Sequence, residues 1–343
     1  MFSSRVSVFY VFGIVLLILG FIAIIFVGTI HIPVSQIVNV LVGNETIPYV
    51  KTIILETRLP MAVAALCCGS LLSVAGLMMQ TLFLNPLAGP SVLGISSGAS
   101  FGVALMLLSA SGLGAFVNNM WFSSFSVLGA VGGSLLTILI LYFFASILKT
   151  NVALLIVGIM ISYLCSSGIS LLNYFSQADE IRNFLVWGMG SFSSLRLSTA
   201  SWLLGLTIII LIPSVFFIKP LNAMLMGERY IESIGYSIKK LRGQLLIVTG
   251  VLVAIPTAFC GPIGFIGLIV PHLCRLLFSS SNHIILIPAS ILYGAVTGLL
   301  CAFLSVLPSS VYGVLPINVI TPIIGVPVIL YLLIKRNKLP YFS

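Results

Sequence analysis

The chain has 343 residues, of which 60% are apolar and only 6% carry a charge. Soluble domains carry roughly 25% charged residues, so this composition excludes a soluble globular protein and predicts a multi-pass membrane protein. The net charge of +9 does not indicate nucleic-acid binding, because the basic residues form no patch with interleaved aromatic side chains.

The first predicted transmembrane helix lies at the N-terminus, over residues 8–29. Arg5 precedes an apolar run that exceeds the roughly 7–15 residues of a signal peptide, and no small-residue cleavage site follows it. We therefore expect this run to be retained as a membrane span.

Nine more apolar segments follow. A helix needs roughly 20 apolar residues to cross a bilayer, and we interpret each segment as one such span. Ten spans place both termini on one side of the membrane. The sequence thus predicts an all-α membrane protein with one transmembrane domain over residues 1–343. The ten spans are residues 8–29, 59–83, 93–110, 122–148, 152–174, 200–218, 243–260, 264–278, 285–306 and 317–334.

The basic residues outside the spans predict the orientation of the protein in the membrane. Cytoplasmic loops carry an excess of Lys and Arg, so the side with more of them is predicted to face the cytoplasm. This side also holds both termini. It carries Arg5, Lys149, Lys219, Arg229, Lys239, Lys240, Arg242, Arg275, Lys335, Arg336 and Lys338, against Lys51, Arg58, Arg182 and Arg196 on the other side.

Small residues four positions apart form stripes on three of the spans. Such stripes let helix backbones approach closely in lipid, so they predict tight packing between spans. Before the third span, "NPLAGP" (85–90) combines two prolines and a glycine, which predicts a turn. The stripes are Ala65, Gly69 and Ser73; Gly94, Gly98 and Gly102; and Gly129 and Gly133.

The most polar stretch between two spans is residues 219–243, between the sixth and seventh. Apolar residues recur there at helical spacing and are interrupted by Gly227 and Gly235, which predicts two short amphipathic helices joined at a turn. Such a segment could lie among lipid headgroups or dock a soluble partner, and the composition favours neither.

The fifth span carries Ser162, Ser166 and Ser170 at four-residue spacing. Hydroxyl groups along one helix face either bond to a neighbouring helix or line a polar pathway. The spacing alone leaves both interpretations open.

Motifs for catalysis are missing from the chain. "GISSG" (94–98) has the spacing of a nucleophile elbow, but it lacks the preceding strand and a His–Asp pair. No Walker motif or HExxH is present, so we expect no catalytic residue, metal site or cofactor on this chain. All six acidic residues lie in or beside loops, which disfavours an ion-coupled secondary transporter.

Four stretches resemble the membrane permeases of ATP-binding-cassette (ABC) importers for iron-siderophores, haem and cobalamin, the FecCD-like family. The long strings "NPLAGPSVLG" and "GFIGLIVPHLCR" are the most specific parts of the resemblance. The match extends over nearly the whole chain in the order of the family. The stretches are residues 58–100, 185–192, 261–277 and 315–333.

This resemblance implies the fold and the partners. It implies a type II ABC importer permease bundle of ten spans, in the inner membrane of a bacterium with both termini cytoplasmic. Two copies would form a homodimer with the pathway along their interface. Two separate ATPase subunits would hold ATP and Mg²⁺, and a periplasmic or lipid-anchored binding protein would deliver the cargo.

The resemblance also implies site residues, and it favours the docking interpretation of residues 219–243. In that segment the ATPase-coupling residues would be Met226, Gly227, Glu228, Ile231, Ile234 and Gly235. Ile231 stands where relatives often have alanine, so the groove of the partner ATPase is expected to differ. The cytoplasmic gate would comprise Asn85, Leu87, Thr150 and Asn151, with Ser162, Ser166 and Ser170 lining the pathway.

Arg58, at the outer end of the second span, matches an arginine that pairs with a glutamate of the binding protein in the family. The alternative is an interfacial anchor that pairs with Glu56. Relatives carry a second arginine where this chain has Met61, so docking here is expected to use fewer ion pairs, with Lys51, Arg182 or Arg196 as substitutes.

The function expected from the sequence is the permease subunit of an ATP-driven importer that moves a bulky iron chelate by alternating access. An iron-siderophore is the first expectation for the cargo, with haem and cobalamin as alternatives. A self-sufficient secondary transporter or channel is the alternative from another functional class.

Overall fold

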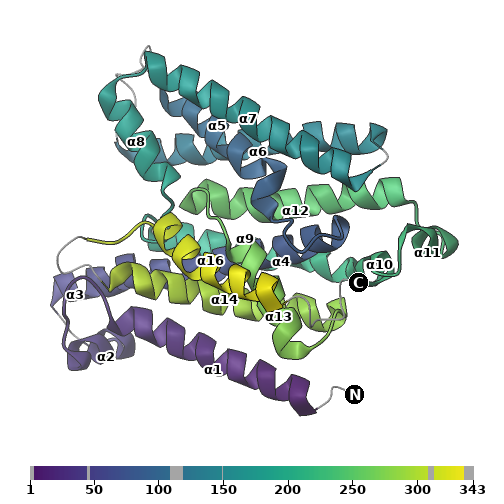
Figure 1. Ribbon diagram of the computed structural model, residues 1–343. Coiled ribbons are helices and arrows are strands. Elements are labelled where there is room, and N and C mark those ends of the chain that lie inside the picture. The colour runs from purple at the N-terminus through teal and green to yellow at the C-terminus, as the bar shows by residue number, and fades with distance from the viewer. Residues whose placement is uncertain (1–3, 45–46, 109–118, 149, 308–312, 336–343) are drawn as a thin grey trace. The chain divides into compact units, whose positions relative to one another are not determined.

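The computed structural model describes residues 4–44, 47–108, 119–148, 150–307 and 313–335. Within these ranges all regular elements are helices, as the sequence predicts (Figure 1). The chain divides into two compact units, which are described separately. Both α4 and α9 continue from one unit into the other.

Unit 1 comprises Met1–Ser73, Ser191–Ile209 and Gly264–Ser343. Its helix α14 packs against α1 and α13, and α16 packs against both α13 and α14. The unit contains the first parts of α4 (Leu59–Leu82) and α9 (Leu197–Phe216). Its other elements are α1 (Ser4–Phe26), α2 (Val34–Val42), α3 (Pro48–Ile53), the single-turn π-helix η1 (Ile54–Arg58), α13 (Ile266–Phe278), α14 (His283–Val306) and α16 (Ile317–Lys335).

The small residues of the second span pack as the sequence predicts. A Cβ added at Gly69 would lie within 2.8 Å of the Gly294 backbone, and a Cβ added at Gly298 would lie 2.9 Å from the carbonyl carbon of Ala65. Backbone therefore meets backbone between α4 and α14, and a larger side chain at either glycine would separate the helices.

Unit 2 comprises Val74–Gly190 and Ile210–Ile263. Its central helix α5 packs against α6, α7, α8 and α12. The unit also contains the last parts of α4 and α9. Its other elements are the 3₁₀ turn η2 (Pro90–Leu93), α5 (Ile95–Leu108), α6 (Asn119–Ile147), α7 (Asn151–Phe175), α8 (Ala178–Gly188), α10 (Ile218–Met224), α11 (Glu228–Ser233) and α12 (Ile238–Cys260).

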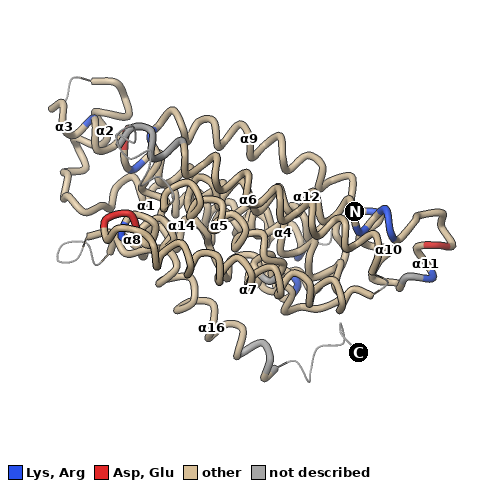
Figure 2. Tube along the Cα trace, turned by 90° about the horizontal axis from the view of Figure 1, so that it is seen from above, with Lys and Arg blue, Asp and Glu red and all other residues tan. Residues whose placement is uncertain are grey.

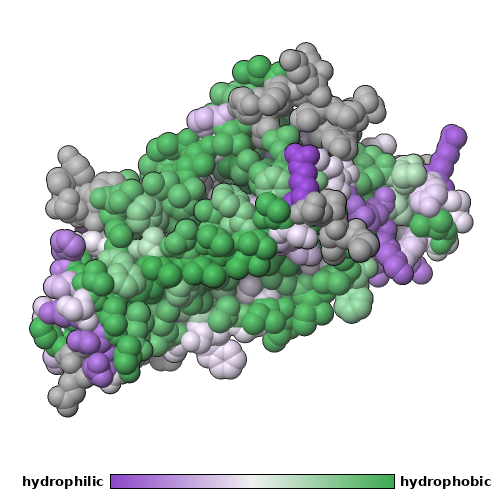
Figure 3. Space-filling view, turned by 90° about the horizontal axis from the view of Figure 1, so that it is seen from below, coloured by the Kyte–Doolittle hydropathy of each residue, from purple (hydrophilic) through white to green (hydrophobic). Residues whose placement is uncertain are grey.

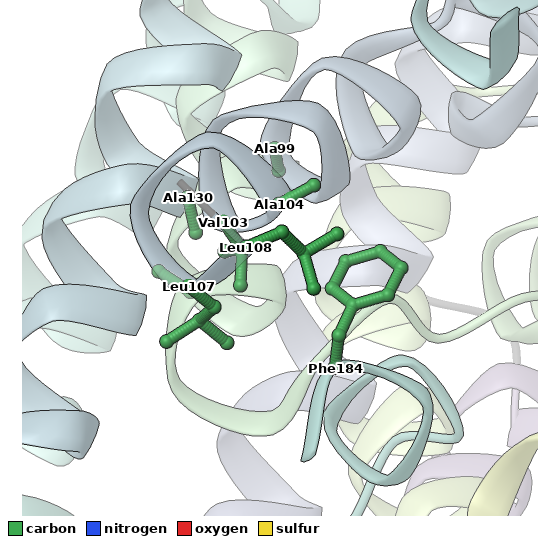
Figure 4. Close-up of a cluster of buried hydrophobic side chains, with 8 residues drawn as sticks. Ala99, Val103, Ala104, Leu107, Leu108, Ala130 and Phe184 are labelled. Atoms are coloured by element: carbon green, nitrogen blue, oxygen red, sulfur yellow. The ribbon is translucent and has the colours of Figure 1, made fainter. Parts of the chain in front are cut away.

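A cluster of small and branched side chains forms a core of unit 2 (Figure 4). Most of it comes from one face of α5, where Ala99, Val103 and Leu107 recur at helical spacing. Ala130 of α6 and Phe184 of α8 close the cluster. Alanines allow the helices to approach, and Phe184 fills the space that remains.

The glycines of the third and fourth spans pack against each other, as expected. A Cβ at Gly98 would lie 2.8 Å from the carbonyl oxygen of Gly133, and Gly102 meets Gly129 in the same way. Gly94 differs from the expectation. It follows η2 with φ 76°, outside the helix, and it faces Gly158 and Ser162 of α7.

The ten predicted spans all fall on helices. Seven helices of the described residues are long and apolar enough to cross a membrane, and three predicted spans fall on shorter apolar helices. The exposed surface is mostly hydrophobic, as Figure 3 shows for one face, which suits a lipid environment. The shorter helices are Ile95–Leu108, Ile266–Phe278 and the Ile317–Leu330 part of α16.

Candidate functional site

Residues 219–243 form two short helices joined at a turn, which confirms that prediction. Helix α10 ends at Met224, Gly227 adopts φ 100° and ψ 161°, and α11 begins at Glu228. An L-residue rarely adopts this backbone conformation, so Gly227 is required by the turn itself.

The second glycine of the segment, Gly235, ends α11. Its φ is 87°, its N–H donates to the carbonyl oxygen of Glu232 at 3.0 Å, and the N–H of Tyr236 donates to Ile231 at 3.2 Å. This pair of hydrogen bonds is a Schellman motif, in which a left-handed glycine satisfies the last carbonyls of a helix. The chain then turns into α12, where Ser237 caps the N-terminus.

The predicted coupling residues divide between surface and interior. Met226 and Ile234 are exposed apolar side chains, as a docking surface requires. Gly235, which follows Ile234 and precedes α12, is also exposed. Ile231 is only 1% exposed. Ile231 therefore anchors the segment instead of meeting a partner, which corrects the expectation that its side chain changes the partner's groove. The side chain of Glu228 lies outside the described part.

An open cavity of about 430 Å³ connects this segment with the end of α6. The cavity is lined by Ala145, Ser146, Ile147 and Leu148 on one side and by Glu232, Ser237, Ile238, Lys239 and Arg242 on the other.

Basic residues gather around α10, α11 and the start of α12, at the end of unit 2 opposite to α8 (Figure 2). Helix α8 carries Asp179 and Glu180 in its first turn. The two ends of this unit therefore differ in charge, in the direction expected for a cytoplasmic coupling segment.

The first predicted gate turn is held by its own backbone. The N–H of Leu84 donates to Thr81 and that of Asn85 to Gln80, which closes the end of α4. Leu84 adopts φ 46°, a conformation that costs an L-residue about 1–2 kcal/mol. The Asn85 Oδ1 atom accepts a hydrogen bond from the N–H of Leu87 at 2.9 Å. Asn85 thus shapes the turn, and Leu87 is left exposed.

The second predicted gate turn meets the first. The Asn151 Nδ2 atom donates to the carbonyl oxygen of Leu82, the last residue of α4, at 3.0 Å. Thr150 caps α7, since its hydroxyl oxygen accepts from the N–H of Ala153 at 3.3 Å. The structure thus brings the two predicted gate turns together. Three of the four predicted gate residues, Asn85, Thr150 and Asn151, make hydrogen bonds that hold these turns.

The three predicted pathway serines differ in exposure. Ser166 and Ser170 are exposed, while Ser162 is half-buried beside Gly94. The hydroxyls of Ser162 and Ser170 donate to carbonyls one turn earlier in α7, at 3.1 Å and 3.0 Å. Ser166 and Ser170 can therefore line a pathway, whereas Ser162 supports the packing of α7 on the start of α5.

Of the three long apolar helices that lie wholly in unit 2, α7 has the smallest buried share, at 17%. Its uncovered side mixes hydroxyl groups with large aromatic and aliphatic side chains, among them Tyr163, Leu164 and Tyr174. A purely lipid-facing helix has no need for exposed serines at adjacent turns. The mixture is more typical of a surface that meets protein and solvent.

Arg58, the predicted docking residue, lies in unit 1 and is only 4% exposed. Its Nη1 atom donates to the carbonyl oxygens of Ile25 and Phe26 at 2.7 and 3.1 Å, and Nη2 donates to Ile30 at 2.6 Å. The last carbonyls of a helix have no partner within it and favour a cation, so Arg58 caps the end of α1. This arrangement favours the anchoring alternative, with backbone carbonyls as the partners in place of Glu56.

Two functional features have no signal in the sequence. The capping role of Arg58 depends on residues about thirty positions earlier in the chain, and Leu84 stands at a position where glycine is usual. Among the described residues, no group of three or more His, Cys, Asp or Glu side chains could hold a metal ion.

The chain is similar to known membrane permeases. The profile of the FecCD transport family matches residues 16–335. The vitamin B12 import system permease proteins BtuC of Salmonella typhi and Salmonella enteritidis PT4 are 35% identical over 288 residues, which cover 82% of this chain and 84% of each relative. A solved chain described as an inward-facing metal-chelate type ABC transporter aligns with a TM-score of 0.78 and 27% identity. That alignment covers 94% of this chain and 97% of the other.

The family match extends from α1 to the end of α16 and contains the predicted coupling segment, both predicted gate turns and α7. The fold is that of a type II ABC importer permease. The protein is therefore a member of the FecCD transport family, a multi-pass inner-membrane permease of the ABC-importer type.

Proposed function

We propose that this chain is the translocating subunit of an ATP-driven importer for a bulky metal chelate. Ferric siderophores, haem and cobalamin share this chemistry, since each is a large organic ligand around a metal ion. The relatives described as vitamin B12 permeases support cobalamin, and the iron-siderophore remains the alternative suggested by the sequence. The proposed class of cargo is common to all three.

The proposal rests on one observation, the structure of the predicted coupling segment, residues 219–243. It presents Met226 and Ile234 on its surface, while Ile231 holds it to the protein. The chain has no nucleotide-binding motif of its own, so the energy would come from two separate ATPase subunits that bind ATP and Mg²⁺. Their closure would push this segment against the end of α6 and thereby move the gate turns.

A homodimer would form the pathway. The uncovered side of α7 carries Ser166 and Ser170 among aromatic and aliphatic residues, which suits a weakly polar wall shared by two copies. A large cargo passes such a wall without strong binding. Leu87 and Thr150 would meet their counterparts across the dimer axis when the gate closes.

The proposed orientation has both termini in the cytoplasm, because eleven of the 15 basic residues lie on that side of the ten spans. A binding protein would dock on the other side. Lys51, Arg182 and Arg196 are exposed. On the proposed outer side they would steer an acidic partner. For Arg58 to pair with a residue of the binding protein, its guanidinium group would have to leave the three carbonyl oxygens that it binds.

The experiment is reconstitution of the permease with its ATPase and its binding protein in liposomes. Cobalamin, a ferric siderophore and haem are compared for stimulation of ATP hydrolysis and for ATP-dependent accumulation. We expect one of them to raise both rates only when the binding protein is present. Accumulation by the permease alone, driven by an ion gradient without nucleotide, would support the secondary-transporter alternative instead.

A further inference from the structure

Helix α2 has an exposed apolar side that neither the gate nor the coupling segment explains. The helix runs from Val34 to Val42 and contains no charged residue. It lies at the C-terminal end of α1, next to α3 (Figure 1). Four aliphatic side chains on it are exposed: Val34, Val38, Leu41 and Val42.

The residues of α2 divide into three sectors. With about 100° between successive residues, the centres of these sectors are about 120° apart around the helix axis. Ile37 and Val40 form the first sector, and both pack against the cluster that also contains Ile25, Val50 and Ile54. The second sector holds the four exposed aliphatic residues, and the third holds Ser35, Gln36 and Asn39.

Each sector suits a different environment. A helix that only covers the protein has one apolar sector and one polar sector. Here a second apolar sector lies beside the first, and the polar sector faces away from both. This is the pattern expected where protein, hydrocarbon and water meet along one helix.

The depth of α2 is fixed by its connection to α1. Helix α1 has 23 residues, which at 1.5 Å per residue is about as long as the hydrocarbon core is thick. The chain then turns back at once, because Arg58 binds the carbonyl oxygen of Ile30 and Ile32 is buried in the same cluster as Ile37. Helix α2 therefore begins at the boundary of the membrane and cannot extend far into water.

Helix α1, which α2 follows in the chain, also has exposed aliphatic side chains, among them Ile18, Leu19 and Ile22. The residues that contribute most to protein–protein binding energy are enriched in Trp, Tyr and Arg, whereas Val and Leu are under-represented among them. Lipid is always present at this boundary, and exposed aliphatic side chains suit it.

We propose that α2 is an interfacial helix that binds the lipid bilayer, with Val34, Val38, Leu41 and Val42 inserted into the leaflet at the C-terminal end of α1. Helices of this kind lie in the plane of the interface with their apolar side about 5–10 Å deep. Ser35, Gln36 and Asn39 face the aqueous side. The turn at Gly43, with φ 86°, ends the helix before the chain leaves the surface.

The test places a spin label on each sector in turn. Single cysteines replace Val38, Val42 and Ser35, and the labelled proteins are reconstituted in vesicles of phosphatidylethanolamine and phosphatidylglycerol. Accessibility to oxygen, which enters lipid, is compared with accessibility to a water-soluble nickel chelate. We expect labels at Val38 and Val42 to favour oxygen strongly and the label at Ser35 to favour the nickel chelate.

A second measurement does not depend on labelling. Tryptophan replaces Val38 or Ser35, and quenching by phospholipids brominated on the acyl chains is recorded against the unsubstituted protein. Quenching at Val38 but not at Ser35 supports the proposal. Equal exposure of both positions to water would overturn it. Protection of Val38 that arises only after the binding protein is added would also overturn it and identify a protein-docking surface.

Discussion

Arg58 is a cationic side chain whose role depends on where its guanidinium group lies. A buried acceptor that loses its donor costs about 1–3 kcal/mol. Arg58 serves three carbonyl oxygens, two in the last turn of α1 and that of Ile30 in the turn that follows. Its neighbour Gly28 leaves room for it, since a Cβ at that residue would lie 2.6 Å from Nε. The residue therefore contributes to folding whether or not it contacts a partner.

We predict that Arg58→Ala lowers the free energy of unfolding by at least about 2 kcal/mol. The purified protein should melt several degrees lower in detergent, while Arg182→Ala and Arg196→Ala leave the melting temperature nearly unchanged because both arginines are exposed. A stable Arg58→Ala variant with weaker, salt-dependent affinity for the binding protein would restore the docking interpretation.

Gly235 combines a special backbone conformation with open space. Its φ is 87°, and nothing lies within 4 Å of a Cβ built there. An L-residue with this φ costs about 1–2 kcal/mol. This cost is small relative to the stability of the whole fold, but it falls on the turn that ends α11.

Gly235→Arg is predicted to uncouple the transporter: the reconstituted complex continues to hydrolyse ATP, and uptake falls by about tenfold or more, the factor that 1.4 kcal/mol represents. Gly43→Arg is the matched control. Gly43 also has a positive φ and open surroundings, but it ends α2. Uptake that is reduced equally in both variants, or in neither, would contradict the coupling assignment.

At the scale of elements, the contact between α5 and α6 depends on glycines that bring two backbones together. Gly98 meets Thr137 and the carbonyl oxygen of Gly133, so no side chain fits between them. Gly132, on α6, has nothing within 4 Å of an added Cβ.

We therefore expect Gly98→Leu to reduce the yield of folded protein strongly, because overpacking of this kind costs about 1–3 kcal/mol or more. Gly132→Leu should give nearly the yield of the unsubstituted protein. The measurement is the monodisperse fraction in size-exclusion chromatography after extraction in mild detergent. Equal yields from the two variants would show that the close approach of α5 and α6 is dispensable.

At the scale of the whole molecule, the uncovered side of α7 requires a second copy if Ser166 and Ser170 line a shared pathway. Cysteines bridge only when their Cα atoms lie within about 7 Å, so crosslinking reports which surfaces meet. Leu139 of α6 is also exposed and is apolar, so it serves as a control for contact with lipid.

Ser166→Cys or Ser170→Cys is predicted to give a disulfide-linked dimer when membranes are treated with a mild oxidant, and Leu139→Cys is predicted to stay monomeric. The native cysteines are buried and should contribute little background. Dimers formed through Leu139→Cys alone would move the interface from α7 to α6. The readout is non-reducing electrophoresis of the whole membrane fraction.

Several parts of the site could be predicted because they depend on local rules. Glycines between short apolar runs predicted the two helices of residues 219–243. The stripe at Gly98 and Gly102 predicted close packing between spans, and the structure shows that the partner is α6. The position of Ile231 could not be predicted. Ile231 and Ile234 are both apolar and lie three residues apart, and only their neighbours in the fold decide that the first is buried and the second exposed.

The sequence alone determined that the protein crosses a membrane many times, that its spans are helical and where those spans lie. These properties follow from composition and apolar length, because an unpaired backbone group is too costly in hydrocarbon. Only the tertiary structure decided that Arg58 caps α1, that Asn151 binds the end of α4 and that α2 has a second apolar side. Each of these depends on contact between segments that lie apart in the chain, and no local pattern of residues specifies such a contact.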